Sequence, residues 1–516
     1  AWVLGVNTLG NLGGALAGGF LLMPLLGVEG LLVAGAVLSL ATAALAASAS
    51  RWRLGIVLPL VGAAAAVVVA TVAPPDVSLL YRGLFRMRSK SVAGAMRDVA
   101  AARLPALVYR HDGKDTSVSL DRLADGNLNF RIGGKIDGGT TDAPTQSMLG
   151  HLGFVFRPAA RDVLVIGLGS GQSAAAAAAH AQTRVLVAEI SPGMVGVTRA
   201  FGPHNQHVLE NPRVEVVYTD GRELLRAQPP ASYDLIASEP SNPWVVGVAD
   251  LYTVESFTLM RSRMRPAGVL VQWVQAYEID DSLLADIICT LHSVFDHVAI
   301  FRMAPNDLAL VASAMPLEVD TRTAAAALAT PAVQAEITGH AGVALPHSLD
   351  EFLVTQLCGT ATVDRLCAAD RSLLLERFLR VEYAAPRAFF AGQSARRLLA
   401  AIDTRVGGEA DTVLGREMSV APLDHGRRRA LHRFLRTSAH REEMGLVAAT
   451  ADASELPIGT QLAAAGLPDP ASVDVAARAR HCDFLGKQGL FGAGARTMFG
   501  AADLGPRVAA WQQACR

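Results

Sequence analysis

The sequence predicts an α/β protein built on a parallel, doubly wound sheet, with apolar helices before it and a helical region after it. Three observations support this fold class. The apolar strand Asp162–Ile166 runs directly into Gly-x-Gly-x-Gly and an Ala-rich helix. Further apolar strands alternate with helical segments as far as residue 315, a pattern typical of a parallel sheet covered by helices on both faces. The chain also begins with long apolar runs.

Length and composition indicate a chain of several domains with a membrane part. The 516 residues suffice for roughly two to four domains. The chain is 51% hydrophobic and 18% charged, which is too apolar for an ordinary soluble protein. The formal net charge of -1 provides no overall field that would attract nucleic acid, so we expect no nucleic-acid partner.

Residues 1–73 are expected to form three transmembrane helices. Three long apolar runs each approach the ~20 residues that cross the ~30 Å hydrocarbon core of a bilayer. These runs are Leu4–Leu26, Val28–Ala47 and Leu54–Val72. Because the first run starts almost at Ala1, we expect further membrane helices to precede this sequence. A basic cluster, Arg82–Lys90, follows the third run and places the next domain in the cytoplasm by the positive-inside rule.

Residues 74–104 are expected to be a connector, and residues 105–146 a small antiparallel β domain. Short alternating runs separated by turns favour such a sheet. The runs are Leu107–Tyr109, Ser117–Leu120 and Asn127–Ile132. The glycine-rich segment Gly133–Gly139 is expected to be a polar loop, and a helix from Ser147 to Phe156 then leads into the first parallel strand.

The glycine turn after that strand predicts a ligand site. Gly167, Gly169 and Gly171 can take positive φ angles and let the backbone approach a ligand closely. The following helix adds free N–H groups and a positive dipole end. An NAD site is the main alternative, but it normally carries Gly-x-Gly-x-x-Gly, whereas the next small residue here is Ser173.

Acidic residues at the ends of the next two strands suggest a bound adenosine. The strand Arg184–Glu189 ends in an acid about 20 residues beyond the glycines. A carboxylate at this position can accept hydrogen bonds from both ribose hydroxyls. The third strand, which begins at Val214, ends at Asp220 and Gly221, and this carboxylate is well placed to hold an adenine amino group. The alternative is a doubly wound domain with a nonspecific glycine turn.

The remaining elements complete a predicted Rossmann-like domain over residues 147–315. The expected strands are Tyr233–Ser238, Gly268–Trp273, His297–Phe301 and Leu308–Ala312, and the expected helices are Val254–Met264 and Asp281–Val294. Ligands of such sheets lie beyond the carboxyl ends of the strands. Residues 316–516 are rich in Ala and Arg and are predicted to be mostly helical, and no function for them follows from the sequence.

The loop after the fourth strand carries the candidate catalytic acid. Pro240 and Pro243 stiffen this loop, which faces the same cleft as the glycine turn. Glu239 could therefore take a proton from an amine nucleophile or orient its lone pair toward an electrophilic carbon. Trp244 could form a wall of the pocket and attract a cation through its ring face. The alternative is a turn in which Glu239 is merely solvated.

Together these motifs resemble the spermidine/spermine synthase family. The resemblance lies in the order of the glycine loop and the acids Glu189, Asp220 and Glu239, and in the segment Leu251–Phe257. It implies a polyamine aminopropyltransferase on the fold of S-adenosylmethionine-dependent methyltransferases, with a small N-terminal β domain. The apolar start of the chain, with Glu382–Arg387, is similar to a bacterial subset fused to major-facilitator-like membrane helices.

The resemblance also implies roles for individual residues. Glu239 stands where the synthases have their catalytic Asp, while Glu189 would hold the ribose and Asp220 the adenine of a decarboxylated S-adenosylmethionine donor. Ser170 and Gly221 would complete the donor site with the three loop glycines. The candidate acceptor-binding residues are Asp137, Gln146, Asn242, Trp244 and Tyr277, with His151 as a similar candidate. No metal is expected.

Several residues depart from the family pattern. Ser170 replaces the loop Asp that pairs with the aminopropyl amine of the donor, which removes an interaction of about 1.5–3 kcal/mol. The replacement also removes the repulsion between that Asp and a carboxylate on the donor. Asn242 replaces the second Asp of the catalytic loop, and Asp137 replaces a Gln. The Tyr-His-Glu that grips the diamine appears as Thr145–Ser147. These changes disfavour putrescine and make S-adenosylmethionine itself an alternative donor.

Three functions follow from these features. The first is a membrane-anchored transferase that moves an aminopropyl group from a decarboxylated S-adenosylmethionine-type donor to an amine. The second is an S-adenosylmethionine-dependent methyltransferase of the same fold, which Ser170 favours. The third is a non-catalytic nucleoside-binding or transport-coupled module. The expected partners are a small-molecule amine and membrane lipid, and a homodimer is left open.

The expected location is the cell inner membrane, with several spans and a cytoplasmic catalytic domain. The cysteines show no Cys-x-x-Cys and no close Cys/His cluster. They are Cys289, Cys358, Cys367, Cys482 and Cys515. Reduced thiols in the cytosol fit this pattern best, so neither a zinc site nor a disulfide framework is expected.

Overall fold

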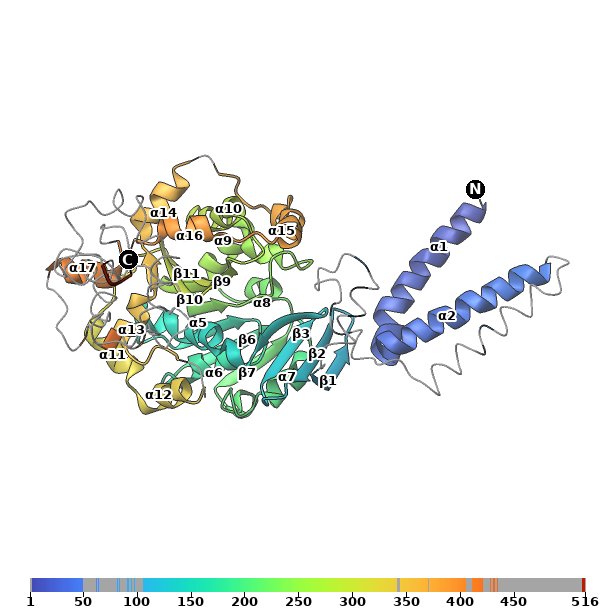
Figure 1. Cartoon of the computed structure of the whole chain (residues 1–516), viewed down its shortest axis with the longest axis horizontal. Helices are drawn as coiled ribbons and strands as arrows, with labels where there is room; N and C mark the ends of the chain where they lie inside the picture. Colours follow the sequence, from blue (N-terminus) through green and yellow to red (C-terminus); the bar gives the residue numbers. More distant parts are fainter. Residues whose placement is uncertain are drawn as a thin grey trace. The chain divides into compact units, whose positions relative to one another are not determined.

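The computed structural model describes residues 2–49, 105–340, 344–369, 371–404 and 411–420, with isolated positions between 62 and 97 and beyond 420. The chain divides into two compact units, whose elements Figure 1 shows. The first unit contains Ala1–Thr140 and Ile190–Phe201, and the second contains Thr141–Glu189 and Gly202–Arg516.

The first unit contains a four-stranded antiparallel sheet in the order β1-β2-β3-β4. Its strands are β1 (Ala106–Asp112), β2 (Ser117–Arg122), β3 (Leu128–Ile132) and β4 (Lys135–Gly139), and the unit also holds α7 (Met194–Ala200). Val118, Leu120 and Phe130 are buried on the sheet. Tyr109 donates a hydrogen bond to the carbonyl oxygen of Gly193 at 2.9 Å, so β1 is tied to the start of α7.

The polar loop expected at Gly133–Gly139 is a turn and a strand instead. Gly133 and Gly134 have φ angles of +55° and +84°, which suit a two-residue hairpin turn between Ile132 and Lys135. The strand that follows carries Lys and Asp among its few side chains, so it lacks the alternating apolar signal by which strands are predicted.

The apolar N-terminal segment forms α1 (Trp2–Leu16), the π-helical turn η1 (Ala17–Leu22) and α2 (Met23–Ala49). Among the described residues, one stretch, Gly5–Ala43, is long and apolar enough to cross a membrane. Gly27 breaks its helical geometry with φ 68° and ψ 176°, and α1 and α2 meet at an angle (Figure 1).

This segment does not support the expected three spans. Glu29 lies within the second expected run and pairs with Arg110 at 3.6 Å, so that run is not uniformly apolar. The third run, Leu54–Val72, and the basic cluster Arg82–Lys90 lie outside the described residues, apart from isolated positions. The described residues thus contain one candidate span, and they do not support a multi-pass arrangement.

The second unit is built on an eight-stranded mixed sheet in the order β12-β10-β11-β9-β8-β5-β6-β7. The strands are β5 (Asp162–Ile166), β6 (Arg184–Glu189), β7 (Val214–Tyr218), β8 (Tyr233–Ser238), β9 (Met264–Gln275), β10 (His297–Ala304), β11 (Asp307–Ser313) and β12 (Gln356–Cys358). Strands β5 to β9 are parallel to one another, and β10, β11 and β12 add antiparallel neighbours. The predicted doubly wound sheet is thus present. We call the edge where its parallel strands end the carboxyl edge.

Helices cover both faces of this sheet. Leu164, Ile236 and Leu270 pack in one core cluster with Phe257 and Leu284, which come from the helices of one face. That face carries α8 (Gly221–Ala227), α9 (Val254–Arg263) and α10 (Asp281–His292), while α5 (Ala143–Phe156) and α6 (Gln172–Ala179) pack together on the other. Short 3-10 turns are η4 (Thr140–Asp142), η5 (Val208–Glu210) and η6 (Ala249–Tyr252).

The region after residue 315 is mostly helical where it is described, as expected. Its helices are α11 (Thr321–Leu328), α12 (Pro331–Thr338), α13 (Leu349–Val354), α14 (Thr360–Cys367), α15 (Arg380–Ala391), α16 (Arg396–Ile402) and α17 (Val413–Val420). It also supplies β12, which the sequence did not predict and which pairs with β10 at the edge of the sheet.

The cysteines contradict the expectation of reduced thiols. Cys289 on α10 and Cys367 on α14 form a disulfide with a Cα–Cα distance of 5.4 Å, and Cys515 is also disulfide-bonded. The first pair is separated by 78 residues, so only the packing of α10 against α14 brings the two together. Spacing alone could not predict this pair. Cys358 is buried as a free thiol.

Candidate functional site

The glycine turn between β5 and α6 lies directly against the loop that follows β8. Gly167 has a φ of +98°, and a Cβ atom at this position would lie 2.5 Å from the carbonyl oxygen of Glu239. Glycine tolerates both this φ and this approach. The backbone N–H of Glu239 donates to the carbonyl of Ile166 at 2.9 Å. The turn and the loop are therefore joined at the carboxyl edge.

The carboxylate of Glu239 is held at the start of α6. Glu239 is half-buried, and its Oε2 atom accepts a short hydrogen bond from the hydroxyl of Ser173. Ser173 lies in the first turn of α6, one residue past Gln172. This contact orients the candidate catalytic acid beside the glycine turn, where the sequence predicted it.

Glu189 ends β6 and is tied to the same turn. Its side chain is buried, and Oε2 accepts a hydrogen bond from the backbone N–H of Leu168 at 2.8 Å. Leu168 lies between Gly167 and Gly169, so the acid expected to hold a ribose also fixes the backbone that would approach the ligand. The role in ribose binding stays a prediction.

Asp220 lies at the start of α8, where it caps the helix. Its side chain accepts from the backbone N–H of Arg222 at 2.7 Å. A Cβ atom on Gly221 would lie 2.8 Å from a methyl group of Ile166, so this glycine lets α8 begin close to β5. Arg222 is braced by Asp250 at 2.8 Å. These contacts fix the position of Asp220 at the carboxyl edge.

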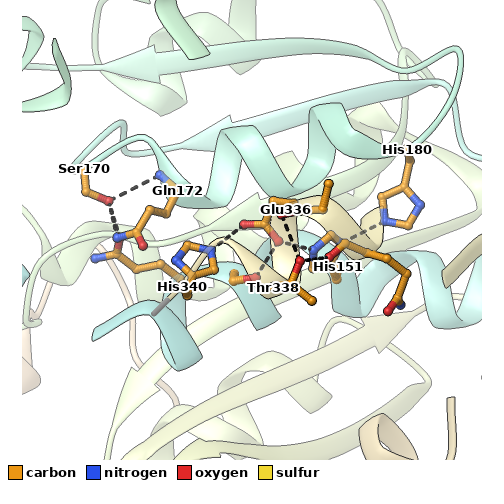
Figure 2. A network of polar contacts seen from close by, with 11 residues as sticks. His151, Ser170, Gln172, His180, Glu336, Thr338 and His340 are labelled. Atoms are coloured by element: carbon orange, nitrogen blue, oxygen red, sulfur yellow. Dashed lines mark hydrogen bonds and ion pairs between the residues drawn. The ribbon is translucent and has the colours of Figure 1, made fainter. Parts of the chain in front are cut away.

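Gln146 holds the glycine loop, and its expected role as an acceptor ligand stays a prediction. It is buried in the first turn of α5. Its Oε1 atom accepts hydrogen bonds from the hydroxyl of Ser170 and from Nε2 of Gln172 at 2.7 Å, and Gln172 Nε2 also donates to Ser170 Oγ at 2.9 Å (Figure 2). The hydroxyl of Ser170 is thus engaged within the protein.

Asn242 and Tyr277 come together beyond β8 and β9. Asn242 is fully buried, and its Nδ2 atom donates to the hydroxyl of Tyr277 at 3.4 Å. Its Oδ1 atom, like the hydroxyl of Ser241, is buried without a hydrogen-bond partner in the described part of the chain. Trp244 is partly buried and packs against the core cluster that contains Phe257 and Leu284. The pair Asn242–Tyr277 thus offers buried polar atoms at the carboxyl edge.

Asp137 belongs to the first unit. It lies on β4 of the first unit, where its carboxylate pairs with Lys135 at short distance. Its predicted role in binding an acceptor stays a prediction.

His151 belongs to a buried polar network that no sequence pattern indicates. The network is centred on Glu336 of α12, which accepts from Ser147 at 2.9 Å and contacts His151 Nε2 at 2.7 Å and His340 Nε2 at 2.9 Å. His151 Nδ1 contacts His180 Nε2 at 3.0 Å (Figure 2). Since Glu336 lies 185 residues beyond His151, only the fold brings them together. His151 is therefore hydrogen-bonded inside the protein, and its candidate role in binding an acceptor stays a prediction.

Electrostatics set the charge state of this network. Burial raises the pKa of Glu336, but His151 and His340 outweigh burial and lower it to about 2. Burial, together with neighbouring His151, lowers the pKa of His180 well below its usual value. The carboxylate is therefore ionised at neutral pH, and His180 is neutral and stacked on Phe154.

Comparisons with known proteins agree with the resemblance seen in the sequence. Residues 143–306 match the family model of the spermine/spermidine synthase domain. The chain is 30% identical to spermidine synthase of Coffea arabica over 152 residues, which are 29% of this chain and 48% of that protein. It is 32% identical to polyamine aminopropyltransferase 2 of Pseudomonas aeruginosa over 178 residues, with coverages of 32% and 50%.

A longer match extends over half of this chain. Polyamine aminopropyltransferase 2 of Streptomyces coelicolor is 30% identical over 276 residues, which are 51% of this chain and 46% of that protein. The chain thus spans about half the length of the curated relatives it matches. The matched region contains the glycine turn, Glu189, Asp220 and Glu239. Residues 143–306 are therefore similar to the spermine/spermidine synthase domain.

Proposed function

We propose that this protein is an aminopropyltransferase that uses decarboxylated S-adenosylmethionine as donor and a small amine as acceptor. The observation that carries the proposal is the position of Glu239. It is hydrogen-bonded by Ser173 and lies against the glycine turn of a spermine/spermidine synthase domain. A carboxylate held there can act on a nucleophile that approaches a bound nucleoside.

The donor would lie across the carboxyl edge of the sheet. Glu189 would accept hydrogen bonds from the ribose hydroxyls, and Asp220 would accept one from the adenine amino group. Both acids end or follow adjacent parallel strands, β6 and β7, and each is held by a backbone N–H of this chain. Preorganised acceptors of this kind lose little conformational freedom when a ligand binds.

The reaction would be a displacement at carbon. The lone pair of the acceptor amine attacks the methylene carbon beside the sulfonium, a C–N bond forms, the C–S bond breaks and sulfur keeps its electron pair. Methylthioadenosine leaves, and the proton lost by the amine passes to Glu239 and then to solvent. Glu239 would orient the amine and take its proton, effects typical of positioned general bases.

A methyltransferase acting on S-adenosylmethionine is the second candidate. It is favoured by Ser170, whose hydroxyl is engaged by Gln146. A carboxylate at this position would repel the carboxylate of S-adenosylmethionine, and Ser170 introduces no such repulsion. A non-catalytic nucleoside-binding module is the outcome if neither transfer occurs.

One product assay separates these functions. Purified protein would be incubated with amines and either donor, and the nucleoside product identified by mass spectrometry. Methylthioadenosine from the decarboxylated donor supports the proposal, and S-adenosylhomocysteine from S-adenosylmethionine supports the second candidate. Nucleoside binding without either product would contradict both.

We further propose that the stretch Gly5–Ala43 anchors the protein in a bilayer. Its length and apolar composition support this, and contact with membrane lipid would follow. Alkaline carbonate extraction of membranes tests the proposal: the chain should stay in the pellet. Release into the supernatant would contradict anchoring. Protease protection in the same membranes would test whether the catalytic domain is cytoplasmic.

A further inference from the structure

Helix α15 carries exposed aromatic side chains to which the proposed transfer reaction assigns no role. Among the described residues of the second unit, large exposed apolar side chains gather between Leu373 and Phe390. Phe378, Tyr383 and Phe390 are 67%, 70% and 66% exposed. Single exposed apolar residues are normal on a protein surface, but several aromatic rings close together in the chain indicate an interaction surface.

Helical spacing places part of this cluster on one side of α15. Tyr383, Arg387 and Phe390 are exposed and follow one another at intervals of four and three residues, the spacing of neighbours on one helix face. On the other side, Val381 and Ala385 join the core cluster, and α15 packs against α10 on the outside of the second unit (Figure 1). A surface helix usually turns polar residues outward, whereas this one presents two rings around an arginine. We call Tyr383, Arg387 and Phe390 the α15 face.

The chain around the α15 face is basic. Residues 371–400 contain six arginines and two glutamates, with no lysine or aspartate. Ion pairs engage Arg380 with Asp286 and Glu376 with Arg222. The exposed arginines that form no ion pair with another described residue are Arg377, Arg387, Arg396 and Arg397. Guanidinium groups bind phosphate through charge-assisted hydrogen bonds, so this surface is complementary to an anionic one.

An anionic bilayer surface matches both the rings and the charge. Aromatic side chains are enriched at the level of the lipid headgroups, and helices that lie there combine them with basic residues. Arg387 can lay its aliphatic stem along the neighbouring rings while its guanidinium reaches a lipid phosphate. A second copy of this chain fits less well, because a symmetric contact would bring two sets of arginines together.

The segment after α15 is joined to the carboxyl edge of the sheet. The carbonyl oxygen of Gln393 accepts a hydrogen bond from the backbone N–H of Glu278 at 3.0 Å. Ser394 pairs with Tyr277 in an antiparallel bridge, and Tyr277 belongs to the candidate site. A contact between α15 and a bilayer would therefore hold the candidate site close to the membrane surface.

We propose that the α15 face docks on the anionic surface of a lipid bilayer. Tyr383 and Phe390 enter the headgroup region, and Arg387 binds lipid phosphate. This docking does not depend on the transfer reaction. If the stretch Gly5–Ala43 anchors the chain, docking becomes an intramolecular step, so a few side chains suffice for it.

A fluorescent label beside the α15 face tests this docking. Ala391→Cys introduces an exposed thiol one helical turn beyond Arg387 and leaves the face unaltered. Glu210→Cys provides a control thiol at another exposed position of the second unit. Each full-length variant carries an environment-sensitive fluorophore and is reconstituted in phosphatidylglycerol nanodiscs that contain nitroxide-labelled headgroups. We expect quenching at residue 391 and none at residue 210, after subtraction of the signal from the native chain treated with the same label.

Substitutions on the face separate docking from anchoring. Tyr383→Ser combined with Phe390→Ser should abolish the quenching at residue 391, with the chain still bound to the disc. Arg387→Glu alone should do the same, and uncharged phosphatidylcholine discs should weaken the quenching. Arg322→Glu changes an exposed arginine on α11 and should leave the quenching intact. The thermal unfolding midpoint of each variant shows that it folds.

Three results would overturn the docking surface. Equal quenching at residues 391 and 210 would show only that the chain lies near lipid. Quenching that survives Tyr383→Ser with Phe390→Ser would show that the α15 face makes no contact. Protection of the Ala391→Cys thiol from a water-soluble maleimide in detergent would show that a second copy or another part of the chain covers the face, and dilution would relieve the protection only in the first case.

Failure of the anchor is distinguishable from failure of the docking surface. Release of the chain from carbonate-washed membranes would contradict the anchor alone, provided that added phosphatidylglycerol vesicles with nitroxide headgroups still quench the label at residue 391. Retention of the chain in the discs without this quenching would contradict the docking surface alone.

Discussion

Helix α5 carries two polar clusters that differ in how fully their groups are paired. In its first turn, Thr145 and Gln146 form hydrogen bonds with residues at the carboxyl edge. At this edge, buried polar atoms such as those of Gln275 remain without partners in the described structure. Within the same helix, Ser147 and His151 are joined to Glu336, whose two oxygens are both occupied. One helix thus faces both a candidate ligand site and a closed interior network.

The difference shows which buried polar residues point to function. The Glu336 cluster satisfies its own hydrogen bonds, so it can stabilise the fold without a ligand. The residues of the carboxyl edge are held in place but leave acceptor and donor atoms unmatched, and a ligand can supply the missing partners. Four variants test this contrast, and they are ordered by the size of the expected effect.

The largest effect is expected at the candidate catalytic acid. Glu239→Gln should lower kcat by about 10²–10⁴-fold, because the amide can neither take a proton nor carry charge. Methylthioadenosine affinity, measured by calorimetry, should change by less than about three-fold, since a group acting on the nucleophile contributes little to nucleoside binding. Glu210→Gln, at an exposed site, serves as control. Turnover close to that of the native enzyme would show that Glu239 is not the catalytic group.

A change in the Glu336 network should lower the free energy of unfolding rather than the activity. Glu336→Ala removes a carboxylate that holds two imidazoles and a hydroxyl, and loss of a buried charged partner typically costs about 3–5 kcal/mol of unfolding free energy. Denaturant unfolding measures this loss. The exposed Glu318→Gln should change stability by less than about 0.5 kcal/mol. If Glu336→Ala were as mild as that control, the network would not be a stabilising element.

A change at Glu189 should lower the affinity for methylthioadenosine, and it should destabilise the fold less than Glu336→Ala does. Glu189→Gln weakens charge-assisted hydrogen bonds worth about 1.5–3 kcal/mol, so methylthioadenosine affinity should fall about 10–100-fold. Isothermal calorimetry gives the affinity, and Glu215→Gln on the exposed face of β7 is the matched control. An unchanged affinity would remove Glu189 from the proposed ribose site.

The smallest effect is a pH dependence from His180. Its folded-state pKa is lowered by burial and by His151, so below pH ~6.5 the unfolded chain binds a proton that the folded chain does not. Stability is therefore complete above that pH and falls below it, by at most about 1.4 kcal/mol per pH unit. His180→Phe keeps the stacking on Phe154 and should flatten the decline between pH 6.5 and 5.5. Equal slopes in denaturant unfolding would contradict this assignment.

The sheet was predictable from the sequence where its strands are buried and parallel. Strands β5, β6 and β8 have the expected bounds, because strands covered on both faces form continuous apolar runs. β4 lacked this signal because Ile136 is its only apolar side chain among Lys, Asp and two glycines. β12 is only three residues long and pairs with a distant strand. The disulfide between Cys289 and Cys367 depends on helix packing that no local pattern encodes.

The site was predictable to the extent that it lies at strand ends. Glu189, Asp220 and Glu239 follow strands whose ends must share one edge of a parallel sheet. The contact between Thr145 and Asp307 joins residues 162 positions apart, and only the antiparallel pairing of β11 with β9 places Asp307 there. Gln146 was predicted to bind the acceptor, which stays a prediction, and its hydrogen bonds to the glycine loop were not predicted from the sequence.

A structure with bound methylthioadenosine tests the central claim most directly. The account predicts the ribose hydroxyls within hydrogen-bond distance of Glu189, the adenine amino group on Asp220, and the sulfur facing Glu239 across the glycine turn. A nucleoside bound elsewhere, or one whose sulfur points away from Glu239, would contradict it.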